Sequence, residues 1–144
     1  MGLIKMAEYP FASVATTPTE TELPLFKEWA WDFDEDHFIY DEKGKHILLE
    51  GNEALKIWCY KALRTERYMY LAYSRNYGIE LYPFMAKVMS VGQRKSELKR
   101  MIIECLMSNP YIVSVDSIIF DETNRNENME VTIVLTTIYG ELII

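Results

Sequence analysis

The hydrophobic period of the chain changes twice along the sequence, and this limits the fold more than any other feature. Apolar residues alternate with a period of two near both ends, whereas in the middle they recur at three- and four-residue spacing. The first pattern is typical of half-buried strands and the second of amphipathic helices. Strands, then helices, then strands predict an α+β fold, with an N-terminal extended arm and β-hairpin, a helical middle, and a C-terminal antiparallel β-hairpin that forms a small sheet.

Short strands are predicted before the first helix. Aromatic residues at positions 29, 31 and 33 alternate with Asp32 and Asp34, as in a strand with one apolar face. Two further β-prone runs, 37–40 and 46–49, flank a turn that contains Gly44. These two runs predict a hairpin.

Helical segments follow in the middle of the chain. The first begins near Asn52, a favourable N-cap residue, and the last covers about 93–108 and ends at the Asn-Pro pair that follows. Residues 79–89 are a weaker helical candidate, because Pro83 is acceptable only in a first turn. The apolar stripes expected to face a core are Leu55, Trp58, Cys59, Ala62 and Leu63 in the first helix, and Leu98, Met101, Ile102, Cys105 and Leu106 in the last.

Two strands and an apolar tail are predicted at the C-terminus. The strands cover 111–120 and 129–138, and the polar residues 121–128 between them form a hairpin loop. Gly140 then bends the chain before the tail, residues 141–144. Because an exposed apolar edge is an aggregation hazard, a partner strand is expected to pair with this tail. The alternative is that the tail folds back onto its own sheet.

The length of 144 residues is sufficient for one domain with a sizeable core. Residues 1–24 contain three prolines separated by threonines, which predicts an extended arm, and residues 25–144 form a single domain. Glu8 and Pro10 interrupt the N-terminal segment before an apolar run develops, so no signal peptide is expected.

The net charge of −7 conceals a segregation of charge along the chain. Residues 1–55 carry a net charge of −8, residues 56–101 carry +7, and residues 102–144 carry −6. Either the acidic ends fold back over the helices, or the protein is a subunit with faces of opposite sign that fix its orientation in an assembly. An acidic protein lacks the counterion release that dominates nucleic-acid affinity, so no nucleic-acid partner is expected.

No metal or cofactor is expected. The residues Asp32, Asp34 and Asp36 have the spacing of the first calcium-loop ligands, but the glycine and the glutamate of such a loop are missing from its sixth and twelfth positions. His37 and His46 resemble a metal triad only loosely, because no motif partner accompanies them. An acidic strand face and surface histidines are the simpler interpretation.

The two cysteines and the apolar runs indicate where the protein works. Cys59 and Cys105 both fall in predicted helices and are expected to be buried thiols of a protein kept in a reducing compartment. No run reaches the roughly 20 apolar residues of a membrane span, so no membrane contact is expected.

Paired carboxylates are the one catalytic arrangement that the sequence allows. Glu66 and Glu80 are candidates for a cell-wall hydrolase, because a glycoside hydrolase requires two carboxyl groups. Glu66, however, adjoins Arg67, and an ion pair keeps a carboxylate ionised, which opposes a general-acid role. A Glu–Arg latch within or between subunits is therefore favoured, and no enzyme activity is expected.

The segment 62–81 is the most unusual part of the sequence. It combines a charged pair with four tyrosines in a stretch without helical or strand periodicity. Tyrosine and arginine dominate binding hot spots, so this loop is predicted to be an interaction surface. The alternative is a loop that its tyrosines pack onto its own core.

The order of motifs around this loop resembles a known family. The motifs are a helix, Thr65-Glu66-Arg67-Tyr68, Tyr77-Gly78-Ile79-Glu80-Leu81, a long helix, Asn109-Pro110-Tyr111-Ile112 and a final β-hairpin. In this order the sequence is similar to baseplate wedge and sheath-initiator proteins of contractile tails, in the branch of PBSX-type prophages, related myophages and R-type bacteriocins. Thr65 stands where that family has proline or glycine, but Glu66 and Arg67 match its charged pair. Trp31-Asp32-Phe33 and residues 136–141 also fit, so the resemblance covers about residues 25–144.

The resemblance implies a structural protein, in six copies around the tail tube. Its implied partners are other baseplate wedge proteins, the tube and hub, and the sheath protein, whose first ring the C-terminal sheet would template. It would be assembled in the bacterial cytoplasm and become part of the baseplate of a virion or tail particle. The residues expected to bind partners are Arg64, Glu66, Arg67, Tyr68, Tyr77, Gly78, Glu80, Ile138, Tyr139, Leu142 and Ile143.

Overall fold

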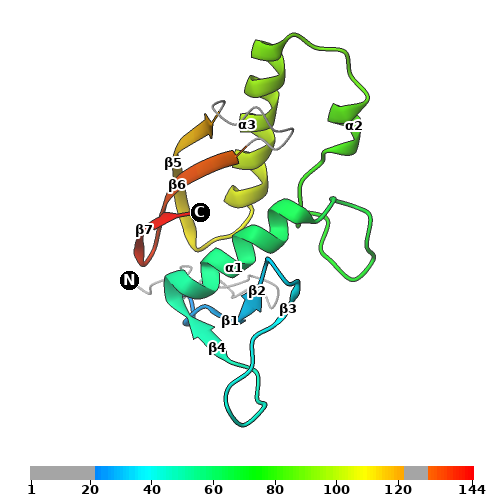
Figure 1. The fold of residues 1–144 in the computed structure, drawn as a ribbon. Helices are drawn as coiled ribbons and strands as arrows, with labels where there is room; N and C mark the ends of the chain where they lie inside the picture. Colours follow the sequence, from blue (N-terminus) through cyan, green and yellow to red (C-terminus); the bar gives the residue numbers. More distant parts are fainter. Residues whose placement is uncertain (1–21, 122–129) are drawn as a thin grey trace, which may run out of the picture.

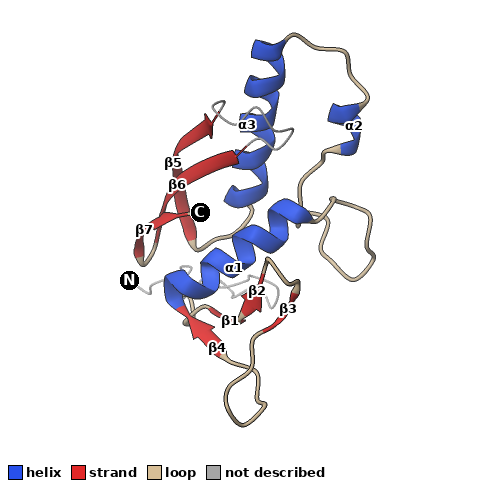
Figure 2. Ribbon diagram, viewed as in Figure 1, coloured by secondary structure: helices blue, strands red, loops and turns tan. Residues whose placement is uncertain are grey.

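The computed structural model describes residues 22–121 and 130–144 and confirms the α+β fold (Figure 1, Figure 2). Two small strand pairs lie on one side of the first helix, and a three-stranded antiparallel sheet lies on the other with the long third helix. The elements are β1 (Lys27–Trp29), β2 (Trp31–Asp32), β3 (His37–Phe38), β4 (Leu48–Glu50), α1 (Gly51–Arg64), α2 (Tyr82–Met85), α3 (Val91–Met107), β5 (Ile112–Asp121), β6 (Glu130–Thr137) and β7 (Gly140–Ile143).

The chain passes from one strand pair to the other at Ala30, between β1 and β2. β1 pairs with β4, and β2 pairs with β3, both antiparallel. Ala30 is buried and bonds to Ile47 and Ile39, whereas Trp29 is 45% exposed. The prediction of one alternating strand through positions 29, 31 and 33 is therefore wrong, because Ala30 interrupts it.

The hairpin predicted from residues 37–40 and 46–49 is confirmed only near its turn. Tyr40 and His46 form an isolated antiparallel bridge, and Gly44 in the turn between them has a φ of +75°. Beyond the bridge, the two arms separate and pair with β2 and β1.

Helix α1 starts one residue before Asn52, which is therefore not its N-cap. Glu50 occupies the cap position and makes no side-chain cap hydrogen bond. The Asn52 side chain instead accepts a hydrogen bond from the hydroxyl of Thr137 and donates one to the carbonyl of Glu141. A polar side chain that could have capped the helix thus connects α1 to the C-terminal sheet.

The helix predicted over 79–89 is wrong except for one turn, α2. Ile79 forms a parallel bridge with Glu66, and α2 begins only at Tyr82. Pro83 lies in its first turn, as its missing N–H requires.

Helix α3 confirms the predicted stop and begins slightly earlier than expected. Ser90 and Gln93 form a capping box, in which each side chain bonds to the backbone of the other residue. Ser108 caps the other end, directly before Asn109.

The C-terminal strands are confirmed, and the tail folds back onto its own sheet. The sheet order is β5-β6-β7, with Val134 opposite Ile143 and Leu135 opposite Leu142. Ile133 and Ile144 exchange two backbone hydrogen bonds of 2.8 and 3.0 Å. Most of the predicted loop 121–128 lies outside the described residues, as does almost all of the arm 1–24.

The core lies between α1, α3 and the inner face of the sheet, as the two apolar stripes predicted. Its fully buried large side chains are Leu55, Leu106, Leu135, Cys59 and Cys105. Both cysteines are free, and burial raises the pKa of each thiol to about 12. Within the described ranges, no helix has both the length and the apolar character needed to cross a membrane.

Candidate functional site

The Glu66–Arg67 pair closes the loop that connects α1 to α2. Backbone hydrogen bonds run from the Ile79 N–H to the Thr65 carbonyl at 2.9 Å and from the Arg67 N–H to the Ile79 carbonyl at 3.0 Å. The two ends of the loop are thus joined as a short parallel bridge. The predicted pairing of Glu66 with Arg67 is wrong, because both residues help to close the loop but each bonds to other partners.

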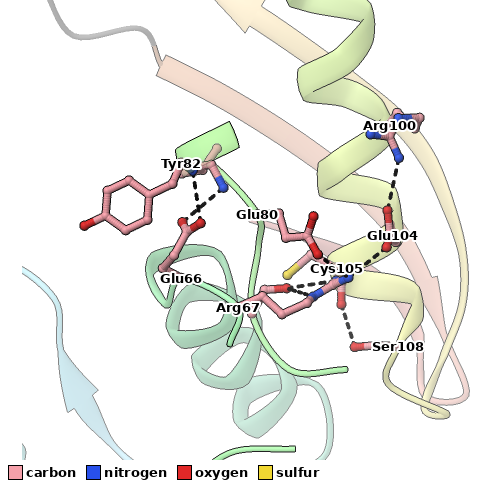
Figure 3. A network of polar contacts seen from close by, with 10 residues as sticks. Glu66, Arg67, Glu80, Tyr82, Arg100, Glu104, Cys105 and Ser108 are labelled. Atoms are coloured by element: carbon pink, nitrogen blue, oxygen red, sulfur yellow. Dashed lines mark hydrogen bonds and ion pairs between the residues drawn. The ribbon is translucent and has the colours of Figure 1, made fainter. Parts of the chain in front are cut away.

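Glu66 caps the start of α2. Its two carboxylate oxygens accept the backbone N–H groups of Leu81 and Tyr82, each at 3.0 Å (Figure 3). Glu80, the other carboxylate of the hydrolase alternative, lies 3.9 Å from the guanidinium of Arg67. Both carboxylates therefore take part in loop closure, and the arrangement lends no support to the hydrolase alternative.

Arg67 lies at the centre of the closure. Its guanidinium donates to the Glu104 carboxylate at 2.7 Å and twice to the Gly78 carbonyl, at 3.2 and 3.0 Å (Figure 3). Only 8% of its side chain is exposed. The hydrogen bond from Arg67 is the main reason why the pKa of Glu104 is lowered, and Arg100 adds to this effect. Arg67 thereby ties both ends of the loop to α3.

Gly78 is required by the closure for two reasons. Its φ is +98°, a conformation that favours glycine. A Cβ at this position would lie 2.6 Å from the Thr65 carbonyl oxygen and 3.1 Å from the Arg67 nitrogen. The close approach of the two loop ends thus depends on the missing side chain.

Aromatic rings support the loop from its tip to the core. Tyr70 contacts Tyr73, Tyr73 contacts Tyr77, and Tyr77 contacts Trp58 of α1, with ring-centroid distances of 5.9, 4.7 and 5.7 Å. Burial is the main cause that raises the pKa of Tyr77 to about 12. Tyr77 therefore belongs to the support of the loop rather than to its free surface.

The tip of the loop is exposed and apolar. Leu71 is fully exposed, Tyr68 is 65% exposed, and Met69 and Tyr70 are about half exposed. Tyr68 also has a φ of +68°, which is rare for a bulky residue. The base of the loop packs on the core, as the alternative interpretation expects, and its tip is exposed. That the tip binds a partner stays a prediction.

Arg64 ends α1 next to a cluster of aromatic rings. Its guanidinium lies 5.2 Å from the Phe33 ring centroid, and its hydrogen bond to the Phe33 carbonyl is long, at 3.4 Å. It forms no ion pair within the described part of the chain, so its charge is available at the surface.

The predicted site residues near the C-terminus differ in their exposure. Ile138 is 47% exposed and Ile143 is 52% exposed, whereas Leu142 is buried in the core. The Tyr139 hydroxyl accepts the Phe26 N–H at 2.9 Å and so joins the C-terminal sheet to the N-terminal segment. The structure thus leaves Ile138, in the turn between β6 and β7, and Ile143, in β7, at the surface, but not Leu142.

The outer edge of β7 carries backbone groups without a strand partner. Hydrogen-bonded pairs alternate in antiparallel strands, and Ile144 bonds to Ile133, so Leu142 and Gly140 are the other residues of β7 that bond to β6. The backbone groups of Glu141 and Ile143 therefore face away from β6. Of these, the Glu141 carbonyl accepts from Asn52, and within the described ranges no strand pairs with this edge.

The acidic turn before β3 is a self-contained structure. The Asp32 carboxylate accepts the N–H groups of Asp34 and Glu35, and these two bonds are the main cause that lowers its pKa. His37 bonds to the Glu35 carboxylate at 2.8 Å, which raises the pKa of the imidazole. The possible ligand atoms of Asp32, Glu35 and His37 lie within 4.8 Å of one another. Because exposed acidic turns of this kind are held by their own hydrogen bonds, we assign no metal to it.

Two residues that connect distant elements were not predicted from the sequence. Glu104 is the ion-pair partner of Arg67, and Asn52 contacts the outer edge of β7. Glu104 lies on the predicted helix 93–108, but no local pattern distinguishes it from the other charged residues there.

Two comparisons with known proteins identify the family of this chain. A model of the family described as contractile injection system sheath initiator matches residues 27–140, which contain β1 to β6 and all three helices. The phage-like element PBSX protein XkdS of Bacillus subtilis (strain 168) is 34% identical over 96 residues, which make up 66% of this chain and 67% of that protein. The chain therefore belongs to the contractile injection system sheath initiator family, and it is a structural component of contractile tails of the PBSX prophage type.

Proposed function

We propose that this chain joins the baseplate wedge around the tail tube, in six copies, and templates the first ring of the sheath. Two separate surfaces would bind the wedge and the sheath. The exposed tip of the loop, residues 68–71, contacts the wedge, and the outer edge of β7 receives a segment of the sheath protein as an added strand.

The outer edge of β7 is the observation that carries this proposal. The N–H of Glu141 and both backbone groups of Ile143 face outward. Backbone hydrogen bonds to such an edge supply affinity, and alternate side chains supply register. An added strand would extend the sheet from three strands to four.

The outer face of the same sheet fits a strand with alternating side chains. Val134 and Ile143 are opposite each other on this face, and Ile143, which lies in the edge strand itself, is 52% exposed. An incoming strand would therefore meet an apolar stretch near Ile143.

The loop tip is suited to the wedge because it is apolar and rigidly supported. Its four exposed residues project from a closure that Arg67, Glu66 and Gly78 hold in place. Large apolar side chains on a fixed support lose little conformational entropy when they bind, which favours tight contacts. We therefore assign Tyr68, Met69, Tyr70 and Leu71 to wedge binding.

Substitution Ile143→Pro tests the sheath half of the proposal in cells that produce the tail particle. Proline removes the outward N–H of residue 143 but no β6–β7 hydrogen bond, so the sheet itself should be retained. The expected result is baseplates and tubes that contain the chain but carry no sheath, as seen by electron microscopy and by mass spectrometry of purified particles.

The matched control is Ile143→Thr, which keeps the N–H and a β-branched side chain, and should allow normal sheaths. Truncation after Gly140 is less suitable, since it also removes Leu142 from the core. Thr136→Pro is likewise unsuitable, because the Thr136 N–H faces β5. Sheaths of normal length on particles with Ile143→Pro would contradict the proposal.

A further inference from the structure

Charges of opposite sign gather at the two ends of the molecule. We call residues 27–50, with strands β1 to β4, the acidic unit, and residues 82–100, with α2 and the first half of α3, the basic prong. The acidic unit has a net charge of −5 and the basic prong +4. Figure 1 shows β1–β4 at one end of the molecule and the start of α3 at the other.

Folding neutralises only part of the charge that the sequence separates. Lys61 pairs with Glu28 at 3.2 Å, and Arg67 pairs with Glu104 at 2.7 Å. These contacts connect the acidic ends of the chain to the basic middle. Neither of these two contacts involves Lys87 or Arg94 of the basic prong.

The basic prong carries cations beside exposed apolar side chains. Lys87 and Arg94 form no ion pair within the described residues, although Arg94 lies over the Phe84 ring at 6.0 Å. Val88 is fully exposed, and Val91 is 74% exposed. A surface of this composition is suited to a partner that is both acidic and apolar.

The acidic unit has that composition. Asp34 and Glu42 are exposed and make no ion pair within the described part of the chain. Tyr40 is 51% exposed, and Leu48 is 43% exposed. Apolar side chains surrounded by negative charge are thus available at the end of the molecule opposite to the prong.

We propose that the basic prong of one copy of this chain docks on the acidic unit of a second copy. The two surfaces lie at opposite ends of the molecule, so they meet between copies. Complementary potentials fix the orientation of such a contact. A contact between two different surfaces is heterologous, and it produces a ring when the rotation between copies closes. The contact between two copies does not depend on the proposed function. Only the arrangement of six neighbouring copies around the tube rests on it.

The contact is expected to be weak in free solution and stronger in the particle. Exposed ion pairs contribute little individually, and salt screens them. Copies that the wedge already holds side by side experience a high effective concentration, which compensates for a weak contact.

Sedimentation velocity of the purified full chain tests the contact. At low ionic strength and protein concentrations up to about 1 mM, a range suited to weak complexes, we expect concentration-dependent oligomers larger than dimers. The variant Lys87→Glu/Arg94→Glu lowers the net charge of the basic prong from +4 to 0, and Asp34→Lys/Glu42→Lys reduces that of the acidic unit from −5 to −1. Each variant should weaken association at least about tenfold, since it removes the complementary charge of one surface. An equimolar mixture of the two variants should restore association, because the unmodified basic prong of one variant then meets the unmodified acidic unit of the other.

The control variant Lys56→Glu/Arg75→Glu changes the net charge by the same amount as the prong variant but outside both surfaces, and it should associate like the unmodified chain. Circular dichroism verifies that every variant is folded. A chain that stays monomeric under these conditions would contradict the inference, as would a mixture of the two variants that does not associate. Neither result bears on the sheath edge, which the Ile143→Pro experiment tests separately.

Discussion

Substitution Gly78→Ala is expected to lower the free energy of unfolding by about 2–4 kcal/mol. The added Cβ would lie 2.6 Å from the Thr65 carbonyl oxygen, and the residue would have to adopt a φ of +98°. Neither the backbone at Thr65 nor that at Arg67 can move without breaking the bridge to Ile79. Urea denaturation followed by circular dichroism measures the change.

Gly44→Ala is the matched control for this substitution. Gly44 also has a positive φ, +75°, but a Cβ there would meet no atom within 4 Å. The expected loss is about 1–2 kcal/mol, the cost of the left-handed conformation alone. Equal losses for the two variants would mean that the contact with Thr65 contributes nothing to the effect of Gly78→Ala.

Substitution Arg67→Ala is expected to cost about 2–3 kcal/mol. It removes two hydrogen bonds from the Gly78 carbonyl and leaves Glu80 and Glu104 without their shared cation. The loss should fall below that of a fully buried ion pair, because Glu104 is 52% exposed and can be rehydrated. Urea denaturation gives the magnitude. Hydrogen exchange of residues 65–80 should also increase, since the loop loses its attachment to α3.

Glu104→Gln separates the charge of this contact from its geometry. Glutamine still accepts a hydrogen bond from Arg67, so the expected loss is below about 1 kcal/mol. In the unmodified chain the folded pKa of Glu104 is lowered, so its contribution to stability is present above the ordinary pKa of the carboxyl group. That contribution is lost as the pH falls through the folded pKa, and Glu104→Gln should remove this acid sensitivity. A loss from Arg67→Ala no larger than that from Glu104→Gln would contradict the central role of Arg67.

Local patterns in the sequence were sufficient to predict the main elements. The stripes that begin at Leu55 and Leu98 identify α1 and α3, because an amphipathic helix shows its buried face through its spacing. The alternation of Ile133 and Leu135 likewise identifies β6. Each of these signals is contained in a short stretch of chain, so no tertiary information is needed to read it.

The errors occur where tertiary contacts override local preference. Asn52 is a favourable cap residue, but its side chain is used by Thr137 and Glu141, more than 80 residues away. Residues 79–81 are not helical, because Ile79 is held by the backbone on both sides of Glu66 and α2 can begin only beyond that bridge. Such long-range contacts leave no trace in the local sequence pattern.

The candidate site was predicted by residue type but not by partner. The charged pair Glu66 and Arg67 and the adjacent Gly78 were expected to bind other subunits, whereas the structure uses them to close a loop that presents Leu71 and its neighbours. For the tail, the sequence left open a partner strand or a return to its own sheet, and the structure shows the return. A partner strand on the outer edge at Ile143 stays a proposal. In both cases the chain first satisfies its own polar groups and then presents a surface that depends on them.

Hydrogen exchange at β7 tests the templating role most directly. In the free chain the amides of Gly140, Leu142 and Ile144 bond to β6 and should exchange slowly, while those of Glu141 and Ile143 should exchange fast. Purified baseplate–tube particles without sheath should show the same pattern, but sheathed particles should protect Glu141 and Ile143 as well. Fast exchange of these two amides in sheathed particles would contradict the proposal that the sheath adds a strand to this edge.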